Sequence, residues 1–182
     1  MQKGDLNMAN AIQPPERSPK PKQERFLRRF YIDTRIDTSS ATQPIFYLLG
    51  EDNDDLSVAI SWDTTSTKNV LGNRTTSSTI SEETLTNDPF YARDEGDPMS
   101  LLLQHLHATD AQLDRIKRNF YMAKVDNTGE TIYAYRQVGD VKLTSVGGPA
   151  DNADNMPFEV TLSGAKVDMD YDFETEIFTD KP

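Results

Sequence analysis

Acidic side chains recur at every second position near the end of the chain. Asp168, Asp170, Asp172, Glu174 and Glu176 alternate with mostly apolar residues, so on an extended strand all five carboxylates share one face. Like charges about 7 Å apart repel each other and need water and counterions around them. We therefore predict that this face borders bulk solvent or a wet, negatively charged passage. Calcium binding is an alternative, although a strand splays carboxylates farther apart than a calcium loop does.

The residue types needed for catalysis or metal binding form no recognisable pattern. The chain has no cysteine, which excludes zinc–thiolate sites, iron–sulfur clusters and thiol nucleophiles. His105 and His107 are the only histidines, and their i, i+2 spacing on a helix points them in different directions. No Gly-x-Ser-x-Gly motif or phosphate-binding loop is present. We therefore expect a protein that is not an enzyme and that binds no metal or cofactor.

Charge is unevenly distributed along the 182 residues, whose formal net charge is -11. Residues 1–36 carry eight basic and four acidic side chains, a balance of +4, whereas residues 37–149 carry -8 and residues 150–182 carry -7. The acidic residues 37–182 repel phosphate backbones, which disfavours nucleic-acid binding. The basic head is instead able to attract the acidic body of a neighbouring copy.

The chain divides into an arm and one domain. Residues 1–25 contain Pro14, Pro15, Pro19 and Pro21, which disfavour both a helix and a central strand, so we expect an extended arm there. Residues 26–182 then form the domain. The longest apolar run, residues 45–49, is far shorter than the roughly 20 residues that span a bilayer, and we expect no secretory signal and no membrane association.

Most of the domain has the patterns of strands. We expect strands near 26–32, 45–49, 56–62, 120–125, 131–138, 141–146, 158–162 and 167–178. One helix begins with Asp97 as its cap and Pro98 in the first turn, and it is expected to end near Ala108. The tally predicts a mainly β fold, a β-sandwich or barrel of about eight strands with one flanking helix.

A long polar segment interrupts the strands. Residues 63–97 are rich in Thr, Ser and Asn, and they are expected to form a projecting loop or a long, weak hairpin. Its charged residues are candidates for contacts between copies of the protein, and these are Lys68, Arg74, Glu82 and Glu83.

The order of these elements resembles that of the major tail protein, or tail tube protein, of long-tailed bacteriophages. The likeness covers roughly residues 26–180. It rests on the segment SWDTTSTKN at 61–69 that leads into the polar loop, the segment NDPFYAR at 87–93, the helix at 97–107 and the charged final strand.

The resemblance implies six copies per ring and rings stacked into a tube. The tube would surround a tape-measure protein, a tail terminator and distal tail or baseplate proteins would bind its ends, and DNA would pass through without specific binding. The five acids of the final strand would then line the lumen, and Lys68, Arg74, Glu82 and Glu83 would join rings. The expected location is the tail of the virion, after assembly in the host cytoplasm.

Two alternatives remain open from the sequence. A secretion-system tube protein shares this fold, so the fold alone does not separate the two. A β-barrel that binds a small apolar ligand, with the helix as a lid, is the other, and it requires an apolar pocket.

Overall fold

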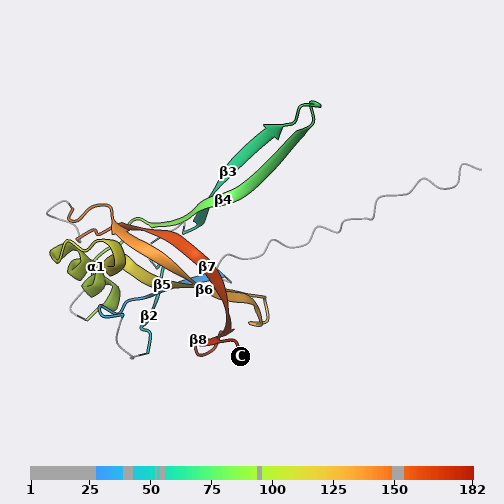
Figure 1. The fold of residues 1–182 in the computed structure, drawn as a ribbon. Coiled ribbons are helices and arrows are strands. Elements are labelled where there is room, and N and C mark those ends of the chain that lie inside the picture. Colours follow the sequence, from blue (N-terminus) through green and yellow to red (C-terminus); the bar gives the residue numbers. More distant parts are fainter. Residues whose placement is uncertain (1–27, 39–42, 52, 54–55, 94–95, 149–153) are drawn as a thin grey trace, which may run out of the picture.

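The structure is a computed structural model that describes residues 28–38, 43–51, 53, 56–93, 96–148 and 154–182 (Figure 1). The proline-rich arm expected at 1–25 lies outside the described residues. The separation into an arm and a domain therefore stays a prediction, and the structure concerns the domain.

The described residues form a mainly β fold with one α-helix, which confirms the expected fold class. The strands are β1 (Arg28–Asp33), β2 (Phe46–Leu48), β3 (Val58–Lys68), β4 (Arg74–Asn87), β5 (Lys117–Val125), β6 (Thr131–Leu143), β7 (Phe158–Asp172) and β8 (Ile177–Asp180). The helix α1 (Pro98–Ala108) is followed by the short 3₁₀ turn η2 (Leu113–Ile116).

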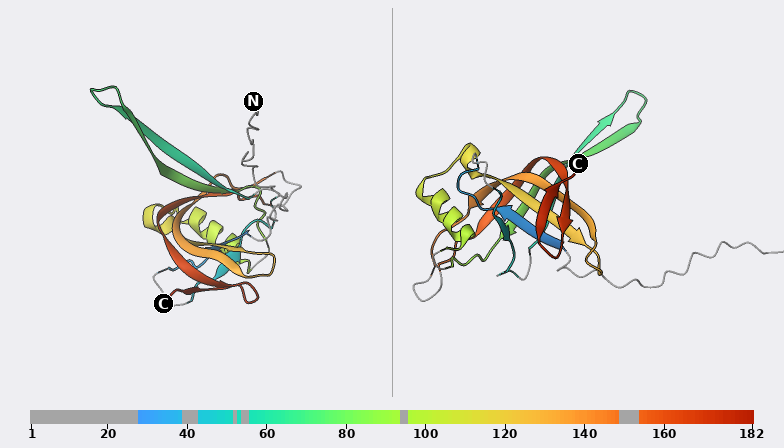
Figure 2. Two further views of the ribbon diagram at one scale, coloured as in Figure 1. Left: turned by 90° about the vertical axis from the view of Figure 1, so that its right-hand side faces the viewer. Right: turned by 90° about the horizontal axis from the view of Figure 1, so that it is seen from below.

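All strands pair antiparallel in one sheet of order β2-β1-β5-β6-β7-β4-β3, with β8 added to β7. The sheet curls along its length (Figure 2). As a result, the rings of Phe46 on β2 and Phe178 on β8 lie 5.5 Å apart. Packed side chains thus bring β2 and β8 together, and the described strands form a partly closed barrel.

An aromatic core fills one face of the curled sheet. The Tyr121 and Phe178 rings lie 5.1 Å apart, and Phe46 packs edge-on against Tyr121 at 4.9 Å. The hydroxyls of Tyr31 and Tyr171 are hydrogen-bonded at 2.9 Å within this cluster. The bond satisfies two polar groups that would otherwise be costly to bury.

The helix α1 covers the other face of the sheet. The Asp97 side chain accepts a hydrogen bond from the Ser100 backbone N–H at 2.8 Å, and Pro98 opens the first turn, as the sequence predicts. The apolar stripe of the helix packs on alternate residues of the central strands, because side chains of neighbouring strand positions point to opposite faces. This helix-side core includes Met99, Leu102, Leu103, Leu106, Phe30, Ile32, Phe120, Val141, Phe158 and Val160.

Several strand predictions are wrong in detail. The strand expected at 158–162 and the first part of the strand expected at 167–178 are one strand, β7, which runs from Phe158 to Asp172. The strands expected at 131–138 and 141–146 are one strand, β6, which ends at Leu143. The strand expected at 167–178 is interrupted, because the chain turns after Asp172. The Asp172 carboxylate accepts hydrogen bonds from the backbone N–H groups of Glu174 (2.9 Å) and Thr175 (3.3 Å), a local pairing that favours a turn over a strand.

We predict that a methyl group at Gly139 destabilises the fold. A Cβ atom there would lie 2.6 Å from Cγ1 of Val160, whose side chain is fully buried. We expect Gly139→Ala to lower the free energy of unfolding by about 1–3 kcal/mol through overpacking. Urea denaturation measures this, with the exposed Ser163→Ala as the control. Equal stability of the two variants would show that β6 and β7 are less tightly packed there.

Candidate functional site

The β3–β4 hairpin leaves the body of the protein as a two-stranded ribbon (Figure 1). β4 pairs with β7 only from Glu83 to Asn87. From Arg74 to Glu82, its only partner among the described strands is β3, and β3 in turn is an edge of the sheet. A two-stranded ribbon is at best marginally stable in water. The ribbon is therefore the part of the molecule that gains most from a covering partner.

The base of the hairpin is anchored in the helix-side core. Val58 and Leu85 are paired across the two strands, and Leu85 is fully buried. Farther out on the same face, Ile60, Trp62 and Ile80 are exposed by 50%, 59% and 47%. We call these three residues the ribbon patch. Alternation along the strand expected at 56–62 puts Val58, Ile60 and Trp62 on one face, but it gives no sign that this face emerges from the core.

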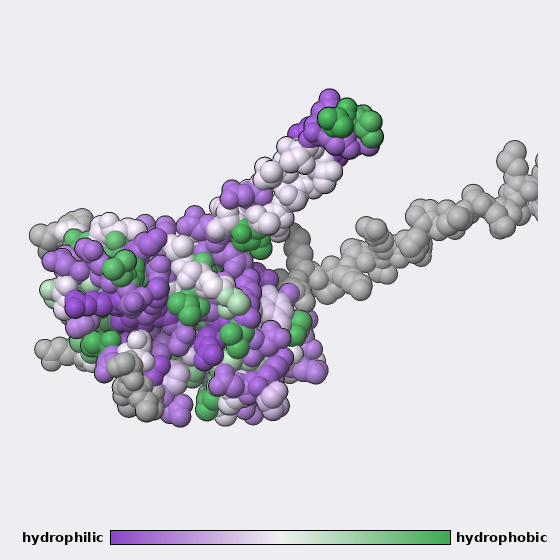
Figure 3. All heavy atoms as spheres, viewed as in Figure 1, coloured by the Kyte–Doolittle hydropathy of each residue, from purple (hydrophilic) through white to green (hydrophobic). Residues whose placement is uncertain are grey.

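The tip of the hairpin (residues 68–74) presents two apolar side chains to solvent. Val70 is fully exposed and Leu71 is 83% exposed, and Figure 3 shows hydrophobic residues at this outer end. The Asn69 side chain accepts hydrogen bonds from the backbone N–H groups of Leu71 (3.0 Å) and Asn73 (2.9 Å). Gly72 takes a φ of 85°, which favours glycine. The turn thus holds Val70 and Leu71 outward.

The four residues predicted to make contacts between copies differ in their exposure and in their position on the hairpin. Lys68 and Arg74 are exposed and paired across the strands beside the tip, and Glu82 is exposed near the base. Glu83 is only 7% exposed, and its carboxylate accepts hydrogen bonds from Lys166 Nζ at 2.8 Å and Gln137 Nε2 at 3.3 Å. The prediction of Glu83 as a contact between copies is corrected, because its side chain is buried against Lys166 and Gln137 of the same chain.

A polar cluster under the ribbon fixes its direction. Lys166 is ion-paired with Glu83, and its Nζ atom lies 5.0 Å from the centroid of the Tyr135 ring. Burial, and then the nearby Glu83 carboxylate, raises the pKa of Tyr135. The Gln137 Oε1 atom is buried and has no partner among the described residues. These charged and polar groups tie β4 to β6 and β7 where the ribbon departs.

The five alternating acids are divided between a strand and a turn. Asp168, Asp170 and Asp172 are exposed on one face of β7, opposite the buried Met169 and Tyr171. Glu174 and Glu176 lie in the turn before β8, so the five carboxylates do not share one strand face as predicted. Their lumen position stays a prediction.

Glu176 has a partner within the chain. Its carboxylate is ion-paired with Arg29 of β1, and the Arg29 guanidinium lies 4.3 Å from the centroid of the Phe173 ring. Arg29 also donates to the Tyr31 hydroxyl at 3.4 Å. The pair therefore fastens the β7–β8 turn to β1 over the aromatic core, which is a structural role.

Among the described residues, the two histidines are not grouped with other side chains that could bind a metal. His105 and His107 are exposed on the last turn of α1. Within the described ranges, no group of three or more His, Cys, Asp or Glu side chains is placed to hold a metal ion. The hairpin, in contrast, carries exposed apolar side chains of the kind found at interaction surfaces.

We predict that alkaline pH destabilises the domain. Burial raises the pKa of Tyr171, with a further contribution from its hydrogen bond with Tyr31, above the ordinary value of 10.0. Above pH 10 the unfolded chain therefore loses the Tyr171 proton while the folded protein keeps it, so the free energy of unfolding falls. The double variant Tyr31→Phe, Tyr171→Phe removes both hydroxyls together. Urea denaturation between pH 8 and pH 11 should show a shallower fall for this variant, and an identical slope would contradict the account.

Comparison with known proteins assigns no family. No protein-family model matches the chain, and no curated protein matches it. Among the residues that the structure describes, no helix is long and apolar enough to cross a membrane.

Proposed function

We propose that the protein is a structural subunit that assembles with copies of itself, and that the β3–β4 hairpin makes the contact between copies. One observation carries this proposal: an ordered two-stranded ribbon projects from the body with exposed Trp62 on its patch and exposed Val70 and Leu71 at its tip. Exposed apolar clusters of this kind mark protein interaction sites.

The assembly that fits best is the tube of a phage tail, built from stacked hexameric rings. A contact between two different surfaces of one subunit gives a closed ring or an open filament, depending on the rotation. The strand β3 is also an edge of the sheet, and an edge strand is a template for pairing with a neighbour. The number six comes from the resemblance in element order.

The lumen in this proposal is lined by acids of β7. Asp168, Asp170 and Asp172 supply three exposed carboxylates per copy on one face. A lining of this charge repels phosphates, so DNA slides past it without binding. A tape-measure protein would occupy the lumen before DNA, while terminator and baseplate proteins would bind the tube ends. The proposed location is accordingly the virion tail.

The two alternatives differ in how well they agree with the hairpin and with the packing of the domain. A secretion-system tube protein would use the same hairpin contact, so it remains the second candidate. A ligand-binding barrel with the helix as a lid requires an apolar cavity under the helix, whereas buried side chains such as Phe120, Phe158 and Met99 pack between the sheet and the helix. The aromatic core on the other face is likewise packed, with ring centroids of Tyr171 and Phe178 only 4.6 Å apart.

Removing the outer hairpin tests the proposal. In the truncated variant, residues 63–79 are replaced by Asn-Gly, a turn that suits a short hairpin. We expect negative-stain electron microscopy of the full chain to show rings or hollow tubes. The truncated variant should stay monomeric and keep the melting cooperativity of the body, because the core lies below Trp62. Rings or tubes of undiminished length in the truncated variant would contradict the role of the hairpin.

A further inference from the structure

An apolar hollow lies beside the first turn of α1. It has a volume of about 420 Å³, within the range of small binding sites. Its apolar lining comes from Ile36, Ile45, Pro98 and Leu101. Ile36, Ile45 and Leu101 are exposed by 49%, 48% and 45%, so three large aliphatic side chains from three separate segments converge on an open surface.

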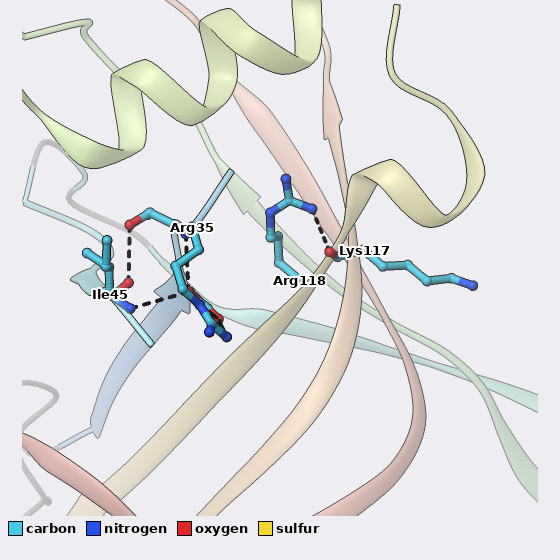
Figure 4. A network of polar contacts seen from close by, with 6 residues as sticks. Arg35, Ile45, Lys117 and Arg118 are labelled. Atoms are coloured by element: carbon cyan, nitrogen blue, oxygen red, sulfur yellow. Dashed lines mark hydrogen bonds and ion pairs between the residues drawn. The ribbon is translucent and has the colours of Figure 1, made fainter. Parts of the chain in front are cut away.

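The walls of this hollow are held in place by a buried carboxylate. Asp33 is fully buried, and it accepts hydrogen bonds from Arg35 Nε at 3.0 Å and from the Ile45 backbone N–H at 3.3 Å (Figure 4). The Thr34 backbone N–H and hydroxyl both donate to the Ile45 carbonyl, at 3.0 and 3.1 Å. This network joins the end of β1 to the residue before β2, and it holds the walls formed by these two segments in a fixed relation to each other.

The hairpin tip of the same molecule does not reach this hollow. In Figure 1 and in the right view of Figure 2, α1 lies at one end of the body and the outer part of the hairpin points away from that end. A contact between tip and hollow therefore joins two copies head to tail. Such a contact uses two different surfaces and continues from copy to copy.

The tip and the hollow are complementary in charge as well as in polarity. Residues 64–81 contain Lys68 and Arg74 and no acidic residue, so the outer ribbon carries +2 on a chain of formal charge -11. The two cations are directly paired across the ribbon, where like charges repel each other. Asp37 and Arg35 line the hollow, and the Arg35 guanidinium is already ion-paired with the buried Asp33. Asp97, whose carboxylate caps α1, stands between the lining residues Gly96 and Pro98. An acidic partner relieves the repulsion at the tip.

From these observations we propose that Val70 and Leu71 at the hairpin tip of one copy insert into the hollow of Ile36, Ile45 and Leu101 on a second copy. Lys68 and Arg74 then face the carboxylates around the hollow. The proposal rests on the proposed function, because it takes the partner to be a second copy, and it deepens that function by naming the receptor surface.

Because the chain has no cysteine, one cysteine introduced into each of two copies reports this contact directly. Two differently tagged populations are mixed, one Leu71→Cys and the other Leu101→Cys, and oxidised. We expect a disulfide-linked dimer of the two populations to form about tenfold or more faster than for a control pair, because docking raises the effective concentration of the thiols. The control pairs Leu71→Cys with Ile132→Cys, a residue of similar exposure (50%) on β6. Ile36→Cys, on another wall of the hollow, should also cross-link rapidly.

The outcomes separate this proposal from the proposed function. Equal rates for Leu101→Cys, Ile36→Cys and the control overturn the docking site, even if electron microscopy shows tubes. Rapid cross-linking at the hollow in a protein that forms neither rings nor tubes supports the docking site and contradicts the tube. High salt should slow the cross-linking at the hollow, because it screens the charges of Lys68 and Arg74.

Discussion

A two-stranded ribbon in water buries very little apolar surface, and the rest of the molecule depends on this constraint. Along the outer part of the β3–β4 hairpin, both faces and both outer edges lack a partner among the described residues. The ribbon nevertheless carries Trp62, Val70 and Leu71 into solvent. Apolar side chains in that position add no stability to the monomer. A partner surface that covers them accounts for their presence.

The body is arranged to hold this ribbon at a fixed angle. The helix-side core grips Leu85 at the base, and the buried Glu83, paired with Lys166 and bonded to Gln137, fixes β4 against the central strands. On the other face, the aromatic core and the Arg29–Glu176 ion pair close the barrel where β7 and β8 turn. A rigid body with a projecting ribbon suits the head-to-tail assembly that we propose.

The sequence predicted the elements whose determinants are local. The cap at Asp97, the place of Pro98 in the first turn and the end of α1 at Ala108 depend on neighbouring residues, and all three agree with the prediction. The turn after Asp172 escaped prediction because alternation of acids and apolar residues outweighed one local hydrogen-bonding side chain. The burial of Glu83 depends on Gln137 and Lys166, far away in the chain, and periodicity does not contain that information.

The central claim is that a second copy covers the ribbon, and amide hydrogen exchange measures this most directly. The exchange of residues 62–80 is compared in dilute and concentrated protein, with the β5–β6 pair as the internal reference. The account predicts rapid exchange of the ribbon in dilute protein and marked protection at high concentration, with β5 and β6 equally protected in both. Ribbon exchange that is the same at both concentrations would contradict it.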